Sequence, residues 1–429
     1  MIFVLKETFM IYALILFAIT YVLMLSFGKY RTYIALGSAV VFIASGMLPI
    51  DKIVGAIDFN VLLMIAGSMG LVQLFIDSKM PDLLAEIIIR KVKNVQMAAV
   101  ALALFAGIIS AFVDNVATVL MVAPVAIQIC KKLNTNPVPF IISIAVSSNL
   151  QGAATLVGDT TAIMLGGEAG MCFLDFFWYE GKPSIFFAVE LGAVASALIL
   201  AFIFRKEKQP IPKQESTTKV TDYVPTVLLL SMLALLIGAS FIENKPDVTN
   251  GLICCVLFVI GLICNYVRYK NKETVLSAVK AIDFQTLGLL LGLFLMIGGI
   301  TEKGVIAAAA DLLAKLGNGN EFLLFTIIVW ASVLISAFID NIPYVATMLP
   351  IITGLGINPT LLYFGLLSGA TLGGNCTPIG ASANITGTAI LRKEGYEVKN
   401  KDFFKIGIPF TLAAVISSYV YLLIVYGTH

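Results

Sequence analysis

The chain has 429 residues, of which 59% are hydrophobic and only 13% are charged. Soluble globular domains carry roughly 25% charged residues, so this composition excludes an ordinary soluble protein. The formal net charge of +2 gives no sign of a nucleic-acid-binding surface, and the mean hydropathy of +0.97 makes the lipid bilayer the partner of most of the chain.

Uncharged apolar runs of 18 or more residues are typical of transmembrane helices, and the sequence contains many of them. In chain order, the expected helices cover residues 9–27, 33–50, 57–77, 138–166, 184–204, 223–242, 249–268, 281–300, 358–391 and 404–427. Two further apolar blocks cover 95–130 and 322–356, and the short segments 81–91 and 303–315 are predicted to be amphipathic surface helices. The predicted fold is an all-α polytopic membrane protein with about ten transmembrane helices.

A charged segment with two prolines, "RKEKQPIPKQESTTK" at residues 205–219, separates two apolar halves and is predicted to be a mobile cytoplasmic loop. We therefore divide the chain into residues 1–204, a cytoplasmic linker at 205–222, and residues 223–429. With the linker inside and each expected helix crossing once, all but six of the 28 Lys and Arg residues lie on the cytoplasmic side. This bias predicts a multi-pass protein of the cell (inner) membrane with both termini outside.

Four short motifs of the first half recur in the same order in the second half. "AIDF" at Ala56 returns at Ala281, "SAFVDN" at Ser110 returns as "SAFIDN" at Ser336, "TLVG" at Thr155 returns as "TPIG" at Thr377, and "LDFF" at Leu174 returns as "KDFF" at Lys401. Under the predicted topology, one apolar block is entered from the cytoplasm and the other from outside, so the halves are predicted to be inverted repeats. Inverted repeats with broken helices are typical of secondary transporters, whose site lies at the midplane between the repeats.

Each apolar block contains one aspartate followed by an asparagine: Asp114 and Asn115 in the first block, Asp340 and Asn341 in the second. A carboxylate at membrane depth is costly unless it is paired, solvated or bound to a cation. If each block is a re-entrant hairpin, its tip offers these side chains as Na⁺ ligands, or the aspartate as a proton site. The alternative is a loop between two full spans, in which the aspartate only caps the following helix.

Two glycine-rich stretches, "SSNLQGAATLVGDTTAIMLGG" from Ser147 and "SGATLGGNCTPIGASANITGT" from Ser368, interrupt expected helices with small and polar residues. Such residues unwind a membrane helix, so that helix N-termini, which favour anions, and free carbonyls, which favour cations, face a cavity. The candidate ligands are Asn149, Gly152, Thr155, Asp159 and Thr160 in the first stretch and Gly374, Asn375, Thr377, Gly380, Ser382 and Asn384 in the second. The alternative is close helix packing through small residues, which fits the glycines but not Asp159.

Other residues that could carry chemistry give weaker signals. Asp58 and Asp283 directly precede apolar runs and are predicted to cap helices at the membrane interface. The six cysteines include no Cys-x-x-Cys spacing, and the one histidine is the terminal His429. The sequence therefore predicts no cofactor. The expected coupling ion is Na⁺ or H⁺.

These motifs resemble the signatures of the ion transporter superfamily, in the branch of arsenite permeases, the pink-eyed dilution (P) protein, D-type sodium/proton antiporters and citrate transporter-like domains. The resemblance covers both halves, nearly the whole chain outside the linker. It implies that the hairpin tips, Asp114–Asn115 and Asp340–Asn341, and the two glycine-rich stretches hold the coupling ion and the substrate. It also favours re-entrant hairpins over two full spans, and it implies that the chain can form a homodimer.

The sequence departs from parts of this superfamily at two places. The citrate and dicarboxylate branch carries Ser-Asn-Thr at the hairpin tips, whereas both tips of this chain carry Asp-Asn. Many P-protein-like members follow Gly-Asp with Pro-Pro-Asn, whereas Asp159 is followed by Thr160 and Thr161. The second departure points towards the sodium/proton antiporters.

The sequence predicts a secondary active permease that moves a small anion by alternating access coupled to Na⁺ or H⁺, the anion being arsenite, another inorganic oxyanion or a carboxylate. A Na⁺/H⁺ antiporter is the first alternative, and a passive ion channel or an intramembrane enzyme is more remote. An intramembrane aspartyl protease would need Gly-x-Gly-Asp, but Leu156 and Val157 precede Gly158 and Asp159, and His-Glu-x-x-His is absent. The sequence leaves open which ion is carried and whether an ATPase subunit binds the chain.

Overall fold

The computed structural model describes residues 2–211, 218–270 and 272–427. Within this part of the chain the fold is all-α, apart from one ribbon in which β1 (Trp178–Tyr179) pairs antiparallel with β2 (Lys182–Pro183). Seven described helices are long and apolar enough to cross a membrane, and an eighth span arises if α15 (Val305–Gly317) and α16 (Glu321–Ser336), bent by 113°, count as one. The chain is a polytopic membrane protein; ten spans and two re-entrant hairpins stay a prediction.

The first half contains ten α-helices among its described residues. They are α1 (Ile2–Ser26), α2 (Arg31–Ala44), α3 (Ile53–Ala56), α4 (Phe59–Asp77), α5 (Met80–Lys91), α6 (Val95–Ser110), α7 (Asn115–Leu133), α8 (Val138–Gln151), α9 (Thr160–Ala169) and α10 (Ile185–Ile203). Short 3-10 turns lie at Gly28–Tyr30, Ile50–Lys52 and Phe173–Phe176. Helix α5 is the first of the two predicted amphipathic helices and buries Pro81, Ala85 and Ile89 on one face.

The second half has a similar order of elements. Besides α15 and α16, its helices are α11 (Val224–Ser240), α12 (Thr249–Tyr269), α13 (Lys272–Lys280), α14 (Phe284–Glu302), α17 (Asn341–Thr353), α18 (Thr360–Gly373), α19 (Ser382–Lys393) and α20 (Asn400–Tyr426). A 3-10 turn, Gly374–Cys376, follows α18. Helices α14 to α19 begin 222 to 226 residues after α4 to α9, respectively. The inverted orientation of the two halves in a bilayer stays a prediction.

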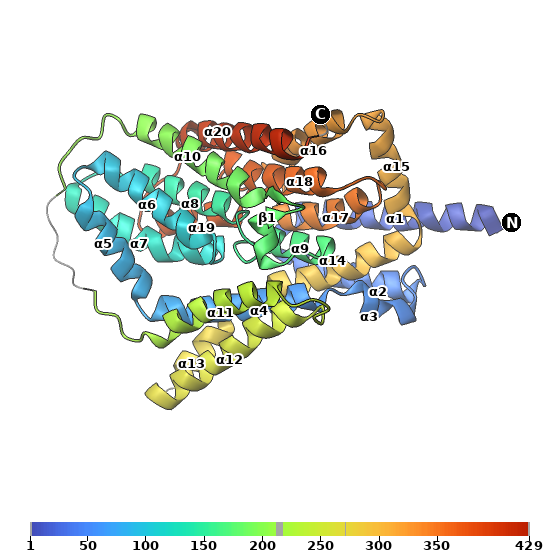
Figure 1. Ribbon diagram of the computed structural model, residues 1–429, viewed down its shortest axis with the longest axis horizontal. Helices are drawn as coiled ribbons and strands as arrows, with labels where there is room; N and C mark the ends of the chain where they lie inside the picture. The colour runs from blue at the N-terminus through green and yellow to red at the C-terminus, as the bar shows by residue number, and fades with distance from the viewer. Residues whose placement is uncertain (1, 212–217, 271, 428–429) are drawn as a thin grey trace.

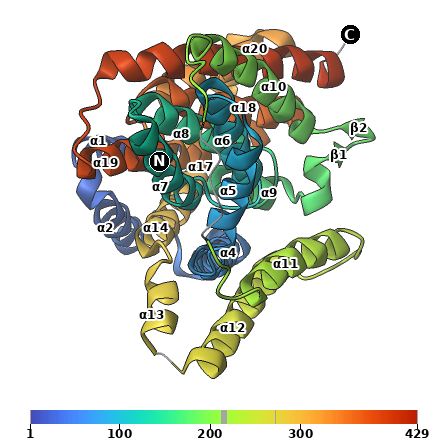
Figure 2. The same ribbon diagram turned by 90° about the vertical axis from the view of Figure 1, so that its left-hand side faces the viewer.

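Each half contributes a helix that packs against the other half. Helix α12 packs against α4, and α2 packs against α14. A Cβ atom on Gly67 of α4 would lie 2.5 Å from the carbonyl carbon of Cys254, and one on Gly292 of α14 would lie 2.7 Å from that of Ala35. Glycine is needed at both crossings because the helix backbones touch there. Figure 2 shows α11, α12 and α13 projecting from one side of the molecule beside α4.

The remaining long helices form a second group, in which α6 packs against α8, α16 against α18, and α10 against α20. Figure 1 shows α10 and α20 side by side along the edge of the molecule opposite α11 and α12. The second arm of each hairpin contacts the other half, since α7 packs against α19 and α17 packs against α9. This interleaving brings the hairpin tips and the helix breaks of both halves together.

Three expected helices differ from the prediction. Helix α2 ends at Ala44 instead of residue 50, because Gly46 adopts a left-handed conformation with φ of +69° and Pro49 follows. The expected helices 138–166 and 358–391 are each broken into two, as their glycine-rich stretches predicted. Helix α13 has no counterpart in the sequence-based expectations.

The predicted linker is attached to the first half at both of its described ends. The backbone N–H of Val95 donates to the carbonyl oxygen of Gln209 at 3.0 Å, and the Thr218 hydroxyl donates to Glu86 at 2.5 Å. These hydrogen bonds place the described ends beside α5 and α6, and the mobility of the loop stays a prediction. Residues 212–217 of the linker lie outside the described residues.

The crossing of α2 and α14 yields a stability prediction. Gly292→Leu places a side chain where two backbones touch, so the free energy of unfolding should fall by about 1–3 kcal/mol. Gly238→Leu is the matched control, since no atom lies within 4 Å of a Cβ built on Gly238 of α11. Thermal unfolding of both variants in detergent measures the difference, and equal unfolding temperatures would contradict the proposed role of Gly292.

Candidate functional site

Each hairpin tip is closed by its aspartate. Asp114 stands between α6 and α7, and its Oδ1 accepts the backbone N–H groups of Val116 at 3.0 Å and Ala117 at 3.2 Å. Asp340 stands between α16 and α17, and its Oδ1 accepts the N–H of Ile342 at 3.1 Å. Both aspartates are therefore N-caps, as the alternative interpretation of the sequence predicted. This role uses one carboxylate oxygen of each residue and leaves Oδ2 for another partner.

A threonine in each helix break holds the neighbouring hairpin tip. The Thr155 hydroxyl donates to the carbonyl of Ala111, and the Thr377 hydroxyl donates to the carbonyl of Ala337 in the equivalent position. Both threonines are buried. The recurrence of threonine in the sequence is thus explained by a contact that fixes each tip to the break beside it.

The predicted glycines of the two breaks are needed for close packing. A Cβ atom on Gly380 would lie 2.6 Å from the Gly374 carbonyl oxygen, and one on Gly374 would lie 2.8 Å from the Gly380 carbonyl oxygen. A Cβ atom on Gly152 would lie 2.8 Å from the Cβ of Asp159. The packing interpretation therefore accounts for these glycines, because the backbone of each break folds back too closely to admit a side chain.

Buried amides connect the two halves. Asn115 Nδ2 donates to Asn149 Oδ1 at 3.0 Å, and Asn149 Nδ2 donates to the Thr371 carbonyl at 2.6 Å and to Asn375 Oδ1 at 3.1 Å. Asn375 Nδ2 donates in turn to the Val146 carbonyl at 2.9 Å. The hydrogen bonds run from the first hairpin tip through α8 to the break that follows α18. Three predicted site residues thus belong to one network.

Asp159 links the first break to the second hairpin tip. Its Oδ1 accepts the Thr160 N–H at 2.7 Å and caps α9, while its Oδ2 accepts the Thr161 hydroxyl at 3.0 Å. Asn341 Nδ2 lies 3.5 Å from the same Oδ2. The side chain of Asp159 is buried. A carboxylate from one half and an amide from the other therefore meet, as the repeat suggested.

The second break has no carboxylate. Ala381 stands at the N-cap position of α19, where no side chain caps the helix. Asn384 bridges the break instead, because its Nδ2 donates to the carbonyl oxygens of Gly374 and Thr377, each at 3.0 Å. The buried Oδ1 of Asn384 has no hydrogen-bond partner among the described residues. The two breaks thus differ in charge although their backbones are similar.

Three carboxylates line one cavity of about 160 Å³ beside the hairpin tips: those of Asp114, Asp159 and Asp283. The cavity is also lined by the predicted residues Asn115, Asn341, Thr160 and Ser382. None of its described lining residues is basic. Carboxylates that share a site of low dielectric repel one another, so a cation or a proton in this cavity would stabilise them.

Asp283 belongs to this cavity, although the sequence predicted only a cap for it. It does cap α14, since Oδ1 accepts the Gln285 N–H at 3.0 Å and Oδ2 accepts the Thr286 hydroxyl at 2.6 Å. The parallel cap prediction for Asp58 is also confirmed, because its Oδ1 accepts the Val61 N–H at 2.9 Å. The "AIDF" repeat was the available signal for Asp283, but it does not indicate a cavity.

Asp340 does not line this cavity. Its Oδ2 accepts a hydrogen bond from Arg31 Nη1 in a salt bridge, within a separate cavity of about 140 Å³ that Tyr21 also lines. The predicted Na⁺ ligands Asp114, Asn115, Asp340 and Asn341 are therefore divided between two places. Arg31 is not among the predicted site residues, and its only signal in the sequence is its position just before an expected helix.

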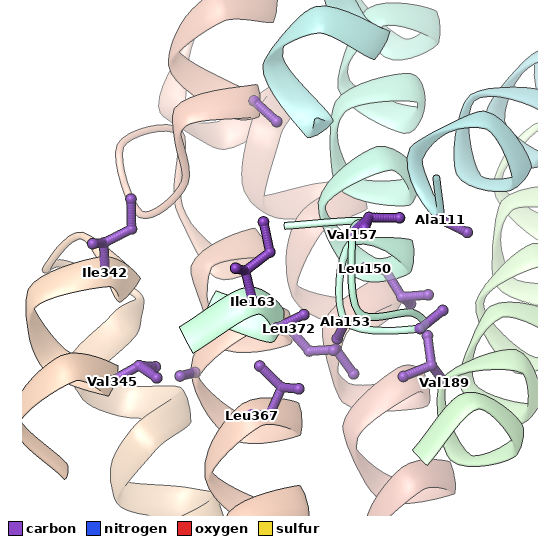
Figure 3. Close-up of a cluster of buried hydrophobic side chains, with 14 of the residues drawn as sticks. Ala111, Leu150, Ala153, Val157, Ile163, Val189, Ile342, Val345, Leu367 and Leu372 are labelled. Atoms are coloured by element: carbon purple, nitrogen blue, oxygen red, sulfur yellow. The ribbon is translucent and has the colours of Figure 1, made fainter. Parts of the chain in front are cut away.

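The elements that carry the polar site residues also contribute buried apolar side chains. Figure 3 shows a cluster of buried apolar side chains that includes Ala111, Leu150, Ala153, Val157, Ile163, Val189, Ile342, Val345, Leu367 and Leu372. These residues come from the hairpins, the first break and helices α8, α9, α10, α17 and α18, and all are buried. Their packing makes this part of the interior apolar, which raises the cost of leaving a buried charge there uncompensated.

Comparison with known sequences gives several matches. The chain matches the family described as "Citrate transporter" over residues 12–356 and over 274–428. A protein of Mycobacterium tuberculosis (strain CDC 1551 / Oshkosh), described as an uncharacterized transporter, is 28% identical over 96% of this chain and 98% of its own length. A 46 kDa membrane protein of Mycobacterium leprae (strain TN) is 32% identical over 73% of both chains. The P protein of Homo sapiens is 26% identical over 96% of this chain and 58% of its own length.

Two solved structures have a similar fold. The YdaH transporter of Alcanivorax borkumensis aligns with a TM-score of 0.59 over 87% of each chain, at 14% identity. MtrF of Neisseria gonorrhoeae, described within a class of antimetabolite efflux pumps, aligns with a TM-score of 0.56 over 99% of this chain and 95% of its own, also at 14% identity. At this identity the likeness concerns the fold alone.

The buried amide network predicts a loss of stability in Asn149→Ala. The substitution leaves Asn115 Nδ2, the Thr371 carbonyl and Asn375 Oδ1 without their partner, and a buried polar group without a partner costs about 1–3 kcal/mol. Thermal unfolding in detergent should show this loss. Ser417→Ala is the control, because among the described residues the Ser417 hydroxyl bonds only to the Ala413 carbonyl of its own helix. Equal losses in the two variants would argue against the network.

Proposed function

Because this chain belongs to the citrate transporter family, we propose that it is a secondary active transporter in which Na⁺ or H⁺ drives the movement of a small anion. The family and its relatives place the chain among membrane transporters of the citrate transporter and P protein type. The observation that carries the finer proposal is the cavity lined by Asp114, Asp159 and Asp283, which has no basic residue among its described lining residues.

The carboxylate cavity is suited to a small cation. Carboxylate, amide and hydroxyl oxygens are hard ligands of the type that hard cations prefer, and a proton on one carboxylate would relieve the same repulsion. Asp114 and Asp159 each use one carboxylate oxygen to cap a helix. The other oxygen of each can then accept a cation or a proton. Binding of Na⁺ or H⁺ would neutralise charge at the place where the hairpin tips and the first break meet.

The same cavity also offers a place for an anion once a cation is bound. Ser382 lines it at the start of α19, and that helix N-terminus has no side-chain cap. In the equivalent position of the first half, the carboxylate of Asp159 caps α9. An oxyanion or a carboxylate of the substrate would occupy at α19 the place that Asp159 occupies at α9, because helix N-termini stabilise negative charge. Arsenite, other inorganic oxyanions and small carboxylates all belong to this class.

Two cavities at opposite ends of α4 support alternating access. The larger, about 810 Å³, is lined by Asp58 and Val61 near the start of α4, and the carboxylate cavity is lined by Gln73 and Ile76 near its end. Helix α4 is long enough to cross a membrane. Solvent can therefore approach the hairpin tips from both sides in turn if the two groups of helices move against each other.

Na⁺/H⁺ exchange is the second candidate. It is favoured by the absence of a basic side chain from the described lining of the carboxylate cavity, since an anion carrier often attracts its substrate with Lys or Arg. In this case Na⁺ and H⁺ would compete for the same carboxylates, and no anion would be moved.

Asp114→Asn and Asp159→Asn test the cation site. Asparagine is as good an N-cap as aspartate, so the fold should persist while the charge is lost. In proteoliposomes, screened with arsenite, silicate, dicarboxylates and Na⁺ against a pH gradient, each variant should lower the apparent cation affinity at least about tenfold, or 1.4 kcal/mol. Asp402→Asn is the control, because Asp402 pairs with Lys405 on the surface. Full coupled transport by both variants would show that these carboxylates do not bind the driving ion.

Ala381→Asp separates the two candidate functions. It places a capping carboxylate at the N-terminus of α19, as Asp159 already does at α9. Anion transport should be lost because the added charge occupies the anion position, whereas Na⁺/H⁺ exchange should continue. Ala381→Asn supplies a neutral cap of the same size as the control and should be far less harmful to anion transport. Loss of exchange in Ala381→Asp with anion uptake intact would contradict the assignment of α19.

A further inference from the structure

The two hairpin tips carry the same sequence motif but differ in their compensation of charge. Asp114 and Asp340 cap their helices in the same way, through Oδ1. The Oδ2 of Asp340 is paired with Arg31, whereas Asp114 takes part in no salt bridge among the described residues. One tip therefore has a resident positive charge, and the other faces two further carboxylates.

Arg31 reaches the second tip because the first two helices pack against it. Arg31 is the first residue of α2, which follows α1 after a short turn. On α1, the Tyr21 hydroxyl donates to the Pro343 carbonyl at 2.5 Å and contacts the Thr347 hydroxyl. Tyr21 and Arg31 thus hold the start of α17 from one side. Arg31 and Asp340 are both only partly exposed, with 30% and 21% of their side chains accessible.

The internal repeat shows that this arginine is not duplicated. Thr32 of α2 lies against Gly288 of α14, and Gly251 of α12 lies against Leu63 of α4. Gly288 and Leu63 stand at equivalent positions of α14 and α4, so Thr32 of α2 corresponds to Gly251 of α12. Arg31 therefore corresponds to Asn250, the residue before Gly251. Asn250 is buried and uncharged. The first tip accordingly receives no counterpart of the guanidinium.

We propose that Arg31 acts as a built-in cation at the second hairpin tip, so that the transporter takes up its coupling cation only at the first tip. The guanidinium occupies the position beside Asp340 that a Na⁺ ion would otherwise fill. This inference rests on the proposed cation-coupled transport, and it assigns that transport a single cation site where the duplicated motif suggests two. Arg31 is thus a residue that determines the stoichiometry of ion coupling.

The physical basis is the cost of an unpaired charge. A carboxylate in apolar surroundings that loses its partner takes up another cation if its ligands can reach one. The tip of the second hairpin offers Asp340 Oδ2 and a cavity of about 140 Å³. Removing the charge of Arg31 should therefore create a Na⁺ site that the natural protein lacks.

The test counts bound Na⁺ by equilibrium dialysis of the purified full-length protein with radioactive Na⁺ at pH 8. Arg31→Gln should bind one more Na⁺ per chain than the unchanged protein, and its unfolding temperature should become more dependent on Na⁺. Arg31→Lys keeps the charge and should show no gain. Arg31→Gln combined with Asp340→Asn should lose the gained site. Lys131→Gln, which breaks the surface pair with Glu394, is the matched control and should also show no gain.

If Arg31→Gln does not fold, Arg31→His tests the same point within one protein. Its imidazole is charged at pH 5.5 and neutral at pH 8.5, so the additional Na⁺ should bind only at the higher pH. No gain of Na⁺ in Arg31→Gln, or a gain that persists with Asp340→Asn, would overturn the inference. The proposed transport is judged separately, by whether Asp114→Asn abolishes the cation site of the unchanged protein.

Discussion

A carboxylate inside a membrane protein needs a hydrogen-bond donor, a cation or a proton beside it, and the centre of this molecule is arranged around that requirement. Asp114, Asp159, Asp283 and Asp340 each give Oδ1 to the N-terminus of a helix. Helix N-termini supply positive potential at each of these four carboxylates. The aspartates differ in the partners of their second carboxylate oxygen. That of Asp340 accepts a hydrogen bond from Arg31, whereas the other three aspartates line one cavity.

The two helix breaks place the N-termini of α9 and α19 at the centre. An unwound segment at membrane depth must satisfy its own backbone, and Thr155 and Thr377 do this for the neighbouring hairpin tips. Asn149 and Asn375 tie the two halves together with side-chain amides. The glycines let the chain turn back on itself without a side chain in the way. A few residues in and around the breaks thus both hydrogen-bond the buried polar groups and let the backbones pack closely.

The duplicated motif suggests symmetry, but the two halves differ in charge. The first break contains Asp159, and the second has Ala381 in the equivalent place. The second tip is neutralised by Arg31, and the first is not. These differences concentrate negative charge on one side of a similar backbone. In the transport that we propose, these two related halves would form one cation site and leave a neighbouring helix N-terminus free for an anion.

The sequence by itself determined the class of protein, the repeated motifs and the breaks, because hydropathy and the recurrence of motifs are local or periodic properties of the chain. It also gave the helix caps at Asp58 and Asp283, since capping involves residues close in sequence. Only the tertiary structure decided that Asp283 joins Asp114 and Asp159, and that Arg31 pairs with Asp340. Those contacts join residues more than a hundred positions apart, and their geometry depends on how helices from both halves interleave.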